Sequence, residues 1–288
     1  MDQTNKMKVI IALVSHGSVN EVIKAIKSIN TSIIKNKGRL EIDLSILIIE
    51  NKSYDDLKTH KEKLKENISL NNYDIKIKQI ENKGYSNAIN FALNYAREGS
   101  FEYLIAGNPD IEFSEDYFNN LSYYLSANRK FSIAVPSVYN NGINQNPRVE
   151  SKVRLRTILM LDIYFSSYVL SLFINYIKYL NSKLLLSVKK KNIEDFTRIL
   201  IPCGVQYIFN IRHIPKSLML DENIFLWGEE LLLSYKLKQL GLYHIYFKNL
   251  KVHHDQSTTV SLLGQYNYYK IAKKSYKYIR KYYFLLNK

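Results

Sequence analysis

Four apolar, β-branched runs alternate with helical patterns in the first part of the chain, and this alternation limits the fold more than any other feature. The first run is KVIIALVS, residues 8–15, and the later ones are IDLSILII, IKIKQI and YLIAG. Between them, apolar residues recur at helical spacing, first at Val19, Val22, Ile23, Ile26 and Ile29. Continuous apolar runs are typical of strands covered on both faces. The sequence therefore predicts an α/β fold with a doubly wound, mostly parallel sheet.

Small or acidic residues follow each of the four runs. In open α/β sheets ligands bind beyond the carboxyl ends of the strands, which share one edge. Asn108-Pro109-Asp110 alone also has the composition of an ordinary turn, and only the other strand ends favour a site there. We therefore expect one crevice lined by Ser15, His16, Gly17, Glu50, Asn51, Asn82, Gly84, Asn108 and Asp110.

Asp110 is a candidate metal ligand, because Mg²⁺ and Mn²⁺ prefer oxygen ligands and commonly bridge to phosphates. One carboxylate binds such an ion poorly, so we expect the ion to bind together with a nucleotide diphosphate. His253 and His254 are candidates for a further metal or diphosphate contact. Neighbouring residues of an extended segment point to opposite sides, so only one is expected to face the crevice; the alternative is a plain core or surface histidine.

Glu229 and Glu230 precede a leucine pattern that predicts a helix over residues 231–240. Acids in a first helical turn stabilise the helix, which is one interpretation of the pair. The other interpretation is a general base that takes a proton from an acceptor hydroxyl.

Composition bounds the remaining possibilities. The 288 residues are 46% hydrophobic and 23% charged, which predicts a globular protein. The single cysteine, Cys203, excludes an internal disulfide framework and a multi-cysteine zinc site. The formal charge of +15 favours an anionic partner, either nucleic acid, an anionic membrane or a phosphorylated substrate. The first residues lack a signal-peptide pattern, so we expect a cytoplasmic location.

Two later segments differ from the rest. Residues 157–180 are nearly all apolar but contain Asp162, which predicts a buried or interfacial helix pair, with a membrane span as the alternative. Residues 266–288 contain no acid and interleave tyrosine with lysine and arginine. They predict a helix that packs its tyrosines on the domain or lies on a membrane surface.

The order of the motifs LVSHG, LIIENKSYDD, NKGYSNAIN, NPD, FLWGEELLLSYKLKQLG and VHHDQST resembles the family 2 inverting glycosyltransferases. The resemblance spans about residues 8 to 260 and is closest to the bacterial rhamnosyltransferase-like branch, which builds O-antigen and capsular polysaccharide. It implies a glycosyltransferase A-type fold with a catalytic domain over residues 1–257. Its nucleotide-sugar-binding half would be 8–112 and its acceptor-binding half 113–257. The second half would carry an apolar helical insertion at about 150–198, and 258–288 would form a C-terminal helix.

The resemblance also implies roles for single residues. Glu50, Asn51 and Ser53 match a motif that contacts the nucleotide base, and Asn82, Gly84 and Asn90 match one that shapes the nucleotide-sugar pocket. Ser15, His16, Gly17 and Asn108 would line the same pocket. Asp110 falls on the metal motif and His254 on the closing histidine, with His253 left open. The catalytic base falls on Glu230, with Glu229 as the alternative, and Gly204, Trp227 and Gly228 would lie on the acceptor side.

The implied reaction is a single inverting displacement that needs Mg²⁺ or Mn²⁺. The donor would be a nucleotide sugar, dTDP-rhamnose first and a UDP-hexose next. The acceptor would be a saccharide on a lipid diphosphate, with the enzyme bound peripherally to the anionic inner face of the cell membrane. Leu232 and Lys236 depart from the family pattern, which leaves a catalytically degenerate scaffold as the alternative. A nucleic-acid partner is not expected, because no recognised binding module is present.

Overall fold

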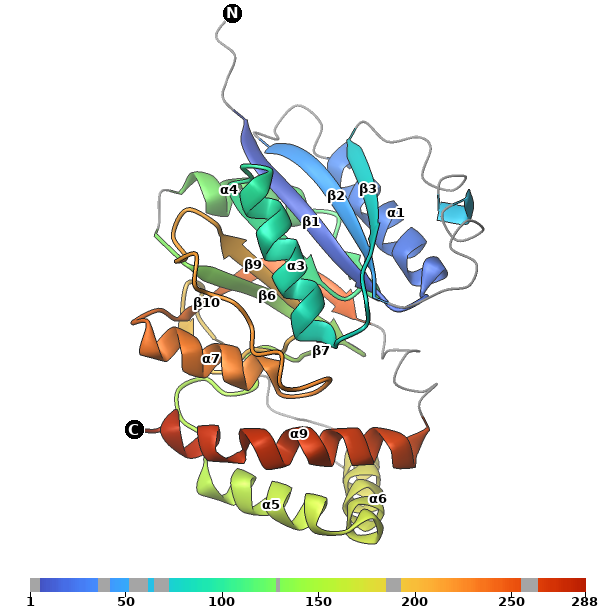
Figure 1. Cartoon of the computed structure of the whole chain (residues 1–288), viewed down its shortest axis with the longest axis vertical. Helices are drawn as coiled ribbons and strands as arrows, with labels where there is room; N and C mark the ends of the chain where they lie inside the picture. Colours follow the sequence, from blue (N-terminus) through green and yellow to red (C-terminus); the bar gives the residue numbers. More distant parts are fainter. Residues whose placement is uncertain are drawn as a thin grey trace, which may run out of the picture.

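The structure is a computed structural model that describes residues 6–35, 42–51, 62–64, 73–127, 130–184, 193–254 and 264–288. A single large sheet runs through it in the order β3-β2-β1-β4-β9-β6-β10-β5 (Figure 1). Its first half consists of β1 (Met7–Ser15), β2 (Ile42–Glu50), β3 (Asp74–Gln79) and β4 (Tyr103–Gly107). These strands are parallel, as predicted, and Ser15 lies opposite Glu50 at their carboxyl ends.

The second half of the sheet is mixed, so the prediction of a mostly parallel sheet is only partly confirmed. Strand β9 (Gln206–Asn210) is antiparallel to both β4 and β6 (Ile133–Asn140). Strand β9 begins beside the carboxyl end of β4, where the Asn108 amide donates to the Val205 carbonyl at 3.0 Å. Because β9 enters the sheet at the carboxyl end of β4, where Gly107 lies opposite Gln206, it runs opposite to β4.

The far edge completes this mixed arrangement. Strand β10 (His244–His254) is parallel to β6 and antiparallel to β5 (Ile111–Phe113). Two short strands, β7 (Ile143–Asn144) and β8 (Arg198–Ile199), pair with β6 and β10. Strand β5 follows β4 after three residues, so Asp110 lies in the tight connection between two strands of the same sheet.

Helices cover both faces of the sheet, which explains why inner strands such as β1 lack polar alternation, whereas the edge strand β3 alternates. Helices α1 (Val19–Lys35) and α4 (Tyr117–Ser126) pack on the face that receives Val9, Ile11 and Leu13. Helices α3 (Tyr85–Glu98) and α7 (Glu229–Gln239) pack on the opposite face, against Ile10 and Ala12. Successive residues of β1 therefore enter two separate hydrophobic cores.

A third layer lies at one end of the molecule (Figure 1). It contains α5 (Leu155–Ser166), α6 (Tyr168–Leu184) and α9 (Gln265–Leu285), and α9 packs between α7 and α5. The predicted helix pair is confirmed as α5 and α6. Among the residues that the structure describes, no helix is both long enough and apolar enough to span a bilayer.

Tyrosines fasten α9 to the domain. Tyr269 and Tyr276 are buried in a core that also contains Phe165 and Ile279. The Tyr276 hydroxyl donates to Asp162 at 2.5 Å, and Arg280 pairs with the same carboxylate at 2.6 Å. Asp162, the acid inside the apolar segment, therefore joins α5 to α9. Of the two alternatives for the C-terminal helix, packing of its tyrosines on the domain is the one observed.

Gly84, in the turn after β3, packs against the main chain of Phe225 in the segment before α7. This close contact leads to a prediction about stability. Its φ is +106°, and a Cβ at this position would lie 2.6 Å from the Phe225 carbonyl oxygen. Gly84→Ala would add a strained backbone conformation, about 1–3 kcal/mol, to an overlap with a main-chain atom. Gly142→Ala is the matched control, because Gly142 has a φ of +74° with no neighbour within 4 Å of its Cβ position.

We expect Gly84→Ala to lower the free energy of unfolding more than Gly142→Ala does, as measured by urea denaturation. Equal losses in the two variants would show that the contact with Phe225 is not tight in the folded protein.

Candidate active site

The first three parallel strands bring their terminal polar residues together. The Asn51 amide donates to the Ser15 carbonyl at 2.8 Å, and the His16 ring Nδ1 donates to the Asn51 carbonyl at 2.8 Å. The Gly17 amide lies 3.4 Å from Oε2 of Glu50. Glu50 is buried, and its Oε1 has no hydrogen-bond partner within the described structure. A buried unpartnered acceptor of this kind fits a hydrogen bond from a bound ligand.

The turn after β3 closes this group. The Asn51 side-chain amide donates to the Gly84 carbonyl at 3.2 Å, and the Gly84 amide donates to Oδ1 of Asn82 at 3.2 Å. Asn82 Nδ2 lies 3.5 Å from the His16 ring. The structure therefore gathers the expected strand-end residues at one edge. Ser53, also expected here, lies outside the described residues.

Asn90 lies near this edge but is already engaged. Its side-chain amide donates to the Leu220 carbonyl at 2.9 Å and to the Glu222 carboxylate at 2.6 Å, while its Oδ1 accepts from the Leu220 amide. Asn90 thus fastens the segment that precedes α7 onto α3. Its expected contact with a nucleotide sugar stays a prediction.

Asp110 and His254 form a second group. Register places His254 opposite Ile111, and its Nε2 lies 3.3 Å from Oδ1 of Asp110. Both atoms are buried and neither makes a well-oriented hydrogen bond. His253 is exposed, and its ring centroid lies 5.9 Å from that of Tyr139. Of the two histidines, His254 is the one beside Asp110.

This pair fits a divalent cation, because a carboxylate oxygen and a neutral imidazole nitrogen are both ordinary metal ligands and both are unsatisfied. No cluster of three or more His, Cys, Asp or Glu side chains able to hold a metal occurs in the described part of the chain. An ion bound there would take its remaining ligands from a diphosphate and from water.

The acidic pair begins α7, directly after Gly228, whose φ is +99°. Glu230 is buried and accepts a hydrogen bond from Arg148 Nη1 at 2.6 Å. Among the described residues no cation pairs directly with Glu229, although the charge of Arg148 also acts on it. Burial, and next the negative charge of Glu230, raise the pKa of Glu229 from 4.5 to about 7. Its Oε2 is buried without a hydrogen-bond partner. The two neighbouring carboxylates therefore differ in chemistry.

Gly204 leaves room beside these acids. A Cβ on Gly204 would lie 3.2 Å from the Tyr207 hydroxyl and 3.6 Å from Oε1 of Glu229. Trp227, the other expected acceptor-side residue, has a φ of +77° and packs its ring against Phe165 and Tyr276. Trp227 therefore faces the helical third layer, while Gly204 adjoins the acidic pair.

Tyr85 lies within electrostatic reach of both Asp110 and the acidic pair. Burial raises its pKa, and the charges of Glu229 and Asp110 raise it further. Its hydroxyl has no partner among the described residues. Tyr85 follows Gly84 directly, so its position in the NKGYSNAIN motif could have identified it as a site residue from the sequence. Arg148 and Tyr207 carried no such signal, since nothing local marks an arginine or a strand tyrosine as a neighbour of Glu230.

Comparisons with known proteins agree with this arrangement. Among solved structures, the chain is similar to the Pyrobaculum calidifontis mannosyltransferase PcManGT, determined with GDP-Man and Mn²⁺, at 12% identity and a TM-score of 0.51. That alignment covers 99% of this chain and 75% of the other. S. aureus TarS is similar at 10% identity and a TM-score of 0.50, over 92% of this chain. The chain spans only 38% of TarS.

These identities show likeness of fold alone. A search among curated protein sequences gives no match. The sequence profile of Glycosyl transferase family 2 matches residues 13–185, more than half of the chain. That region contains the strand-end groups and Asp110, and the expected glycosyltransferase A-type fold is the one observed. The chain belongs to glycosyl transferase family 2.

Proposed function

We propose that this protein transfers a sugar from a nucleotide-diphosphate donor to an acceptor hydroxyl with inversion at the anomeric carbon. The observation that carries the proposal is that two groups with unpartnered buried atoms, among the described residues, both act on the Tyr85 hydroxyl through their charges. One is Asp110 with His254, suited to a cation and a diphosphate, and the other is Glu229 with Glu230, suited to proton transfer. A donor bound at the first group and an acceptor bound at the second would lie near each other.

Asp110 and His254 would hold Mg²⁺ or Mn²⁺, which when bound supplies positive charge near the departing diphosphate. Support comes from their unsatisfied buried atoms and from the Mn²⁺ in the mannosyltransferase complex. The buried Glu50 carboxylate, with the Asn51 amide beside it, suits hydrogen bonding to the nucleotide base.

Glu229 is the better proton acceptor of the two acids in this structure. Glu230, favoured by the family motif, is paired with Arg148 at 2.6 Å, so this oxygen already accepts a charge-assisted hydrogen bond. Glu229 has a free buried oxygen and a pKa of about 7, which suits a general base near neutral pH. Glu229 would take the acceptor proton while Arg148 keeps Glu230 in place.

For the donor we propose dTDP-rhamnose, with a UDP-hexose next, on the basis of the Asn-Pro-Asp form of the metal motif. The acceptor would be a lipid-diphosphate-linked saccharide of O-antigen, capsule or another surface polysaccharide. This assignment places the protein in the cytoplasm, at the inner face of the cell membrane.

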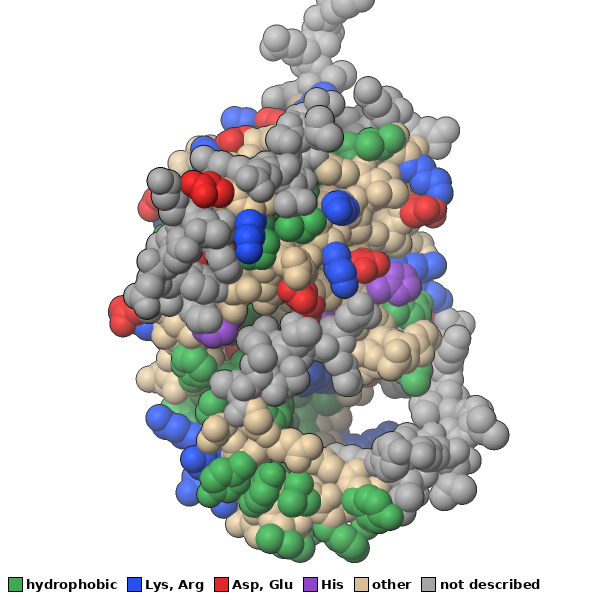
Figure 2. All heavy atoms as spheres, turned by 90° about the vertical axis from the view of Figure 1, so that its right-hand side faces the viewer, with side chains coloured by type: hydrophobic (Ala, Val, Ile, Leu, Met, Phe, Trp, Pro, Cys, Tyr) green, Lys and Arg blue, Asp and Glu red, His purple; other side chains and the backbone are tan. Residues whose placement is uncertain are grey.

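The outer face of α5 and α6 supports the membrane contact. Apolar side chains there are 40–72% exposed, and Figure 2 shows hydrophobic side chains gathered at this end of the molecule. They include Leu155, Leu159, Ile163, Val169, Phe173 and Ile177. Lys152, Arg154 and Arg156 lie at the start of α5. An apolar helical face flanked by cations matches the interface of an anionic bilayer.

The donor site is tested by calorimetric titration with a panel of nucleoside diphosphates and nucleotide sugars, with Mn²⁺ and again with EDTA. We expect one nucleotide class to bind only with the cation. Asp110→Ala should weaken that binding at least about tenfold, because it removes a charged ligand. His253→Ala, on the far side of β10, is the control and should bind normally. Absence of nucleotide binding under every condition would refute the transferase and favour the scaffold alternative.

The base is tested with Glu229→Gln. We expect kcat to fall about 10²–10⁴-fold, and the wild-type rate to rise with pH from 6 to 8 as Glu229 loses its proton. Folding raises the pKa of Glu229, so the ionised side chain opposes folding above its unfolded pKa of 4.5. The variant should therefore gain stability relative to wild type, by about 1–3 kcal/mol at pH 8 and less at pH 5.

Thermal unfolding across this pH range measures the gain, and Glu98→Gln, at an exposed site, should show none. The charged groups that act on the pKa of Glu229 are Glu230, which raises it, and Arg148, which lowers it. The charge of Glu229 in turn raises the pKa of Tyr85, Tyr207 and Tyr268. If Glu230→Gln abolishes turnover while Glu229→Gln retains it, the base is Glu230 instead.

Membrane contact is tested by flotation with phosphatidylglycerol vesicles, using phosphatidylcholine vesicles for comparison. We expect binding to the anionic vesicles that salt weakens and that Val169→Glu reduces severalfold. Ile34→Glu is the matched control, since Ile34 is 71% exposed and Val169 72%. Equal binding by both variants would exclude α6 as the contact surface.

A further inference from the structure

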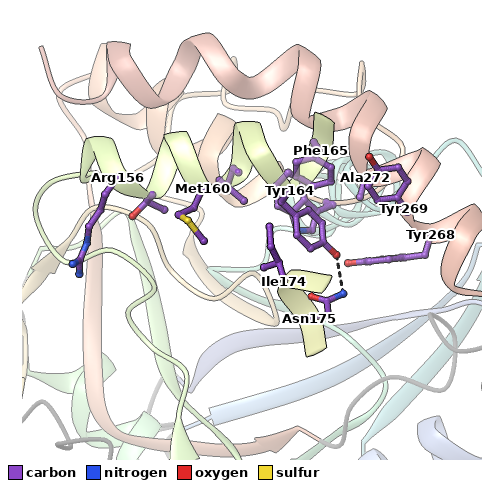
Figure 3. Close-up of a pocket in the computed structure, with 12 residues that line it drawn as sticks. Arg156, Met160, Tyr164, Phe165, Ile174, Asn175, Tyr268, Tyr269 and Ala272 are labelled. Carbon is purple, nitrogen blue, oxygen red and sulfur yellow. Dashed lines mark hydrogen bonds between the residues drawn. The ribbon is translucent and has the colours of Figure 1, made fainter. Parts of the chain in front are cut away.

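A pocket of about 570 Å³ lies between α5, α6 and α9, outside the donor site (Figure 3). Its size is that of a small-molecule site. Aromatic rings from three separate parts of the chain form one end of it, namely Tyr164, Phe165, Trp227, Tyr268 and Tyr269. Arg156 lies at the opposite end (Figure 3).

The lining is mostly apolar, and its polar groups include Arg156, Thr157 and the hydroxyls of three tyrosines. Met160, Leu161, Ile174 and Ala272 add aliphatic surface to the aromatic rings, and no carboxylate is among the described residues that line the pocket. The side-chain amide of Asn175 is already used, because it donates to the Tyr164 hydroxyl at 3.2 Å. A saccharide needs many hydrogen-bonding partners, whereas a hydrocarbon chain needs apolar area. The pocket suits the hydrocarbon.

Residues that line the pocket lie near both the acidic pair of α7 and the outer apolar face of α5. Trp227 lies two residues before Glu229. Tyr268 lies within electrostatic reach of the acidic pair, since its pKa is raised by burial and also by the charges of Glu229 and Glu230. Met160, by contrast, is 49% exposed and adjoins Leu159 on the outer apolar face of α5. The pocket is therefore lined both by a residue of the apolar exterior, Met160, and by a residue within electrostatic reach of the proposed base, Tyr268.

We propose that this pocket binds the hydrocarbon chain of an acceptor whose saccharide is joined to a lipid phosphate. The proposal rests on the transferase function above and names the part of the acceptor that the enzyme holds. With the chain in the pocket, the attached headgroup would extend past Trp227 and Tyr268 toward Glu229. Contact with the outer face of α5 and α6 would place the pocket at the bilayer surface, where such a chain is available.

Trp227 is the only tryptophan in the chain, which gives a direct readout. The probe is dodecyl phosphate with a terminal bromine, used below its micelle concentration, because bromine quenches tryptophan fluorescence only at close range. We expect saturable quenching. Over a series of shorter brominated alkyl phosphates, affinity should rise about threefold to fourfold for each added methylene until the pocket is full.

Met160→Glu and Leu159→Glu form a matched pair, because the two side chains are adjacent and 49% and 51% exposed, but only Met160 lines the pocket. A carboxylate in an apolar pocket repels the chain, so Met160→Glu should weaken quenching at least about tenfold while Leu159→Glu leaves it unchanged. Equal weakening by both would mean adsorption to the outer face and would overturn the proposal. Absence of saturable quenching, or displacement of the probe by a free oligosaccharide, would overturn it as well.

Nucleotide titration of the same samples separates the two proposals. Normal nucleotide binding without alkyl-phosphate quenching refutes the hydrocarbon site and leaves the transferase standing. Absence of nucleotide binding by the wild-type protein refutes the proposed transferase function itself. The Met160→Glu variant should keep wild-type nucleotide affinity, which shows that it has folded.

Discussion

The close pairing of β4 with β9 is the constraint on which the rest of the site depends. At Gly107 a Cβ would lie 2.6 Å from the Val205 carbonyl, so only glycine lets the two strands meet there. The pairing brings the exit of β4, with Asp110, next to the entrance of β9, with Gly204. Residues about a hundred positions apart thereby become neighbours, and the parallel half of the sheet joins the mixed half, beside which the acids of α7 lie.

Charge burial distinguishes the two carboxylates of α7. Both begin the same helix, where the dipole favours anions. Arg148 neutralises Glu230, while Glu229 remains desolvated beside a like charge, and its proton affinity rises. Two chemically identical side chains thus have different surroundings because of one arginine from a distant loop.

The helical third layer gives the α/β domain a second kind of surface. The tyrosines of α9 fill the space between α7 and α5, and Asp162 holds Arg280 and Tyr276 within that contact. This packing leaves the opposite sides of α5 and α6 apolar and exposed. The same helices that stabilise the segment around the acids would therefore present an apolar face to a bilayer and a pocket to a hydrocarbon chain.

Local pattern was enough to predict much of this protein. The apolar runs placed β1, β2 and β4 because a strand buried on both faces has no polar alternation, and the alternating segment IKIKQI placed the edge strand β3. The parallel order brought their polar ends to one edge. The order of motifs indicated the family, and the apolar segment indicated the helix pair.

Only the tertiary structure decided the direction of one central strand and which side chains pair with one another. Antiparallel β9, the choice of His254 over His253 beside Asp110, and the pairing of Arg148 with Glu230 all depend on contacts between residues distant in the chain. No local periodicity encodes such contacts, because they arise only when separate elements pack together.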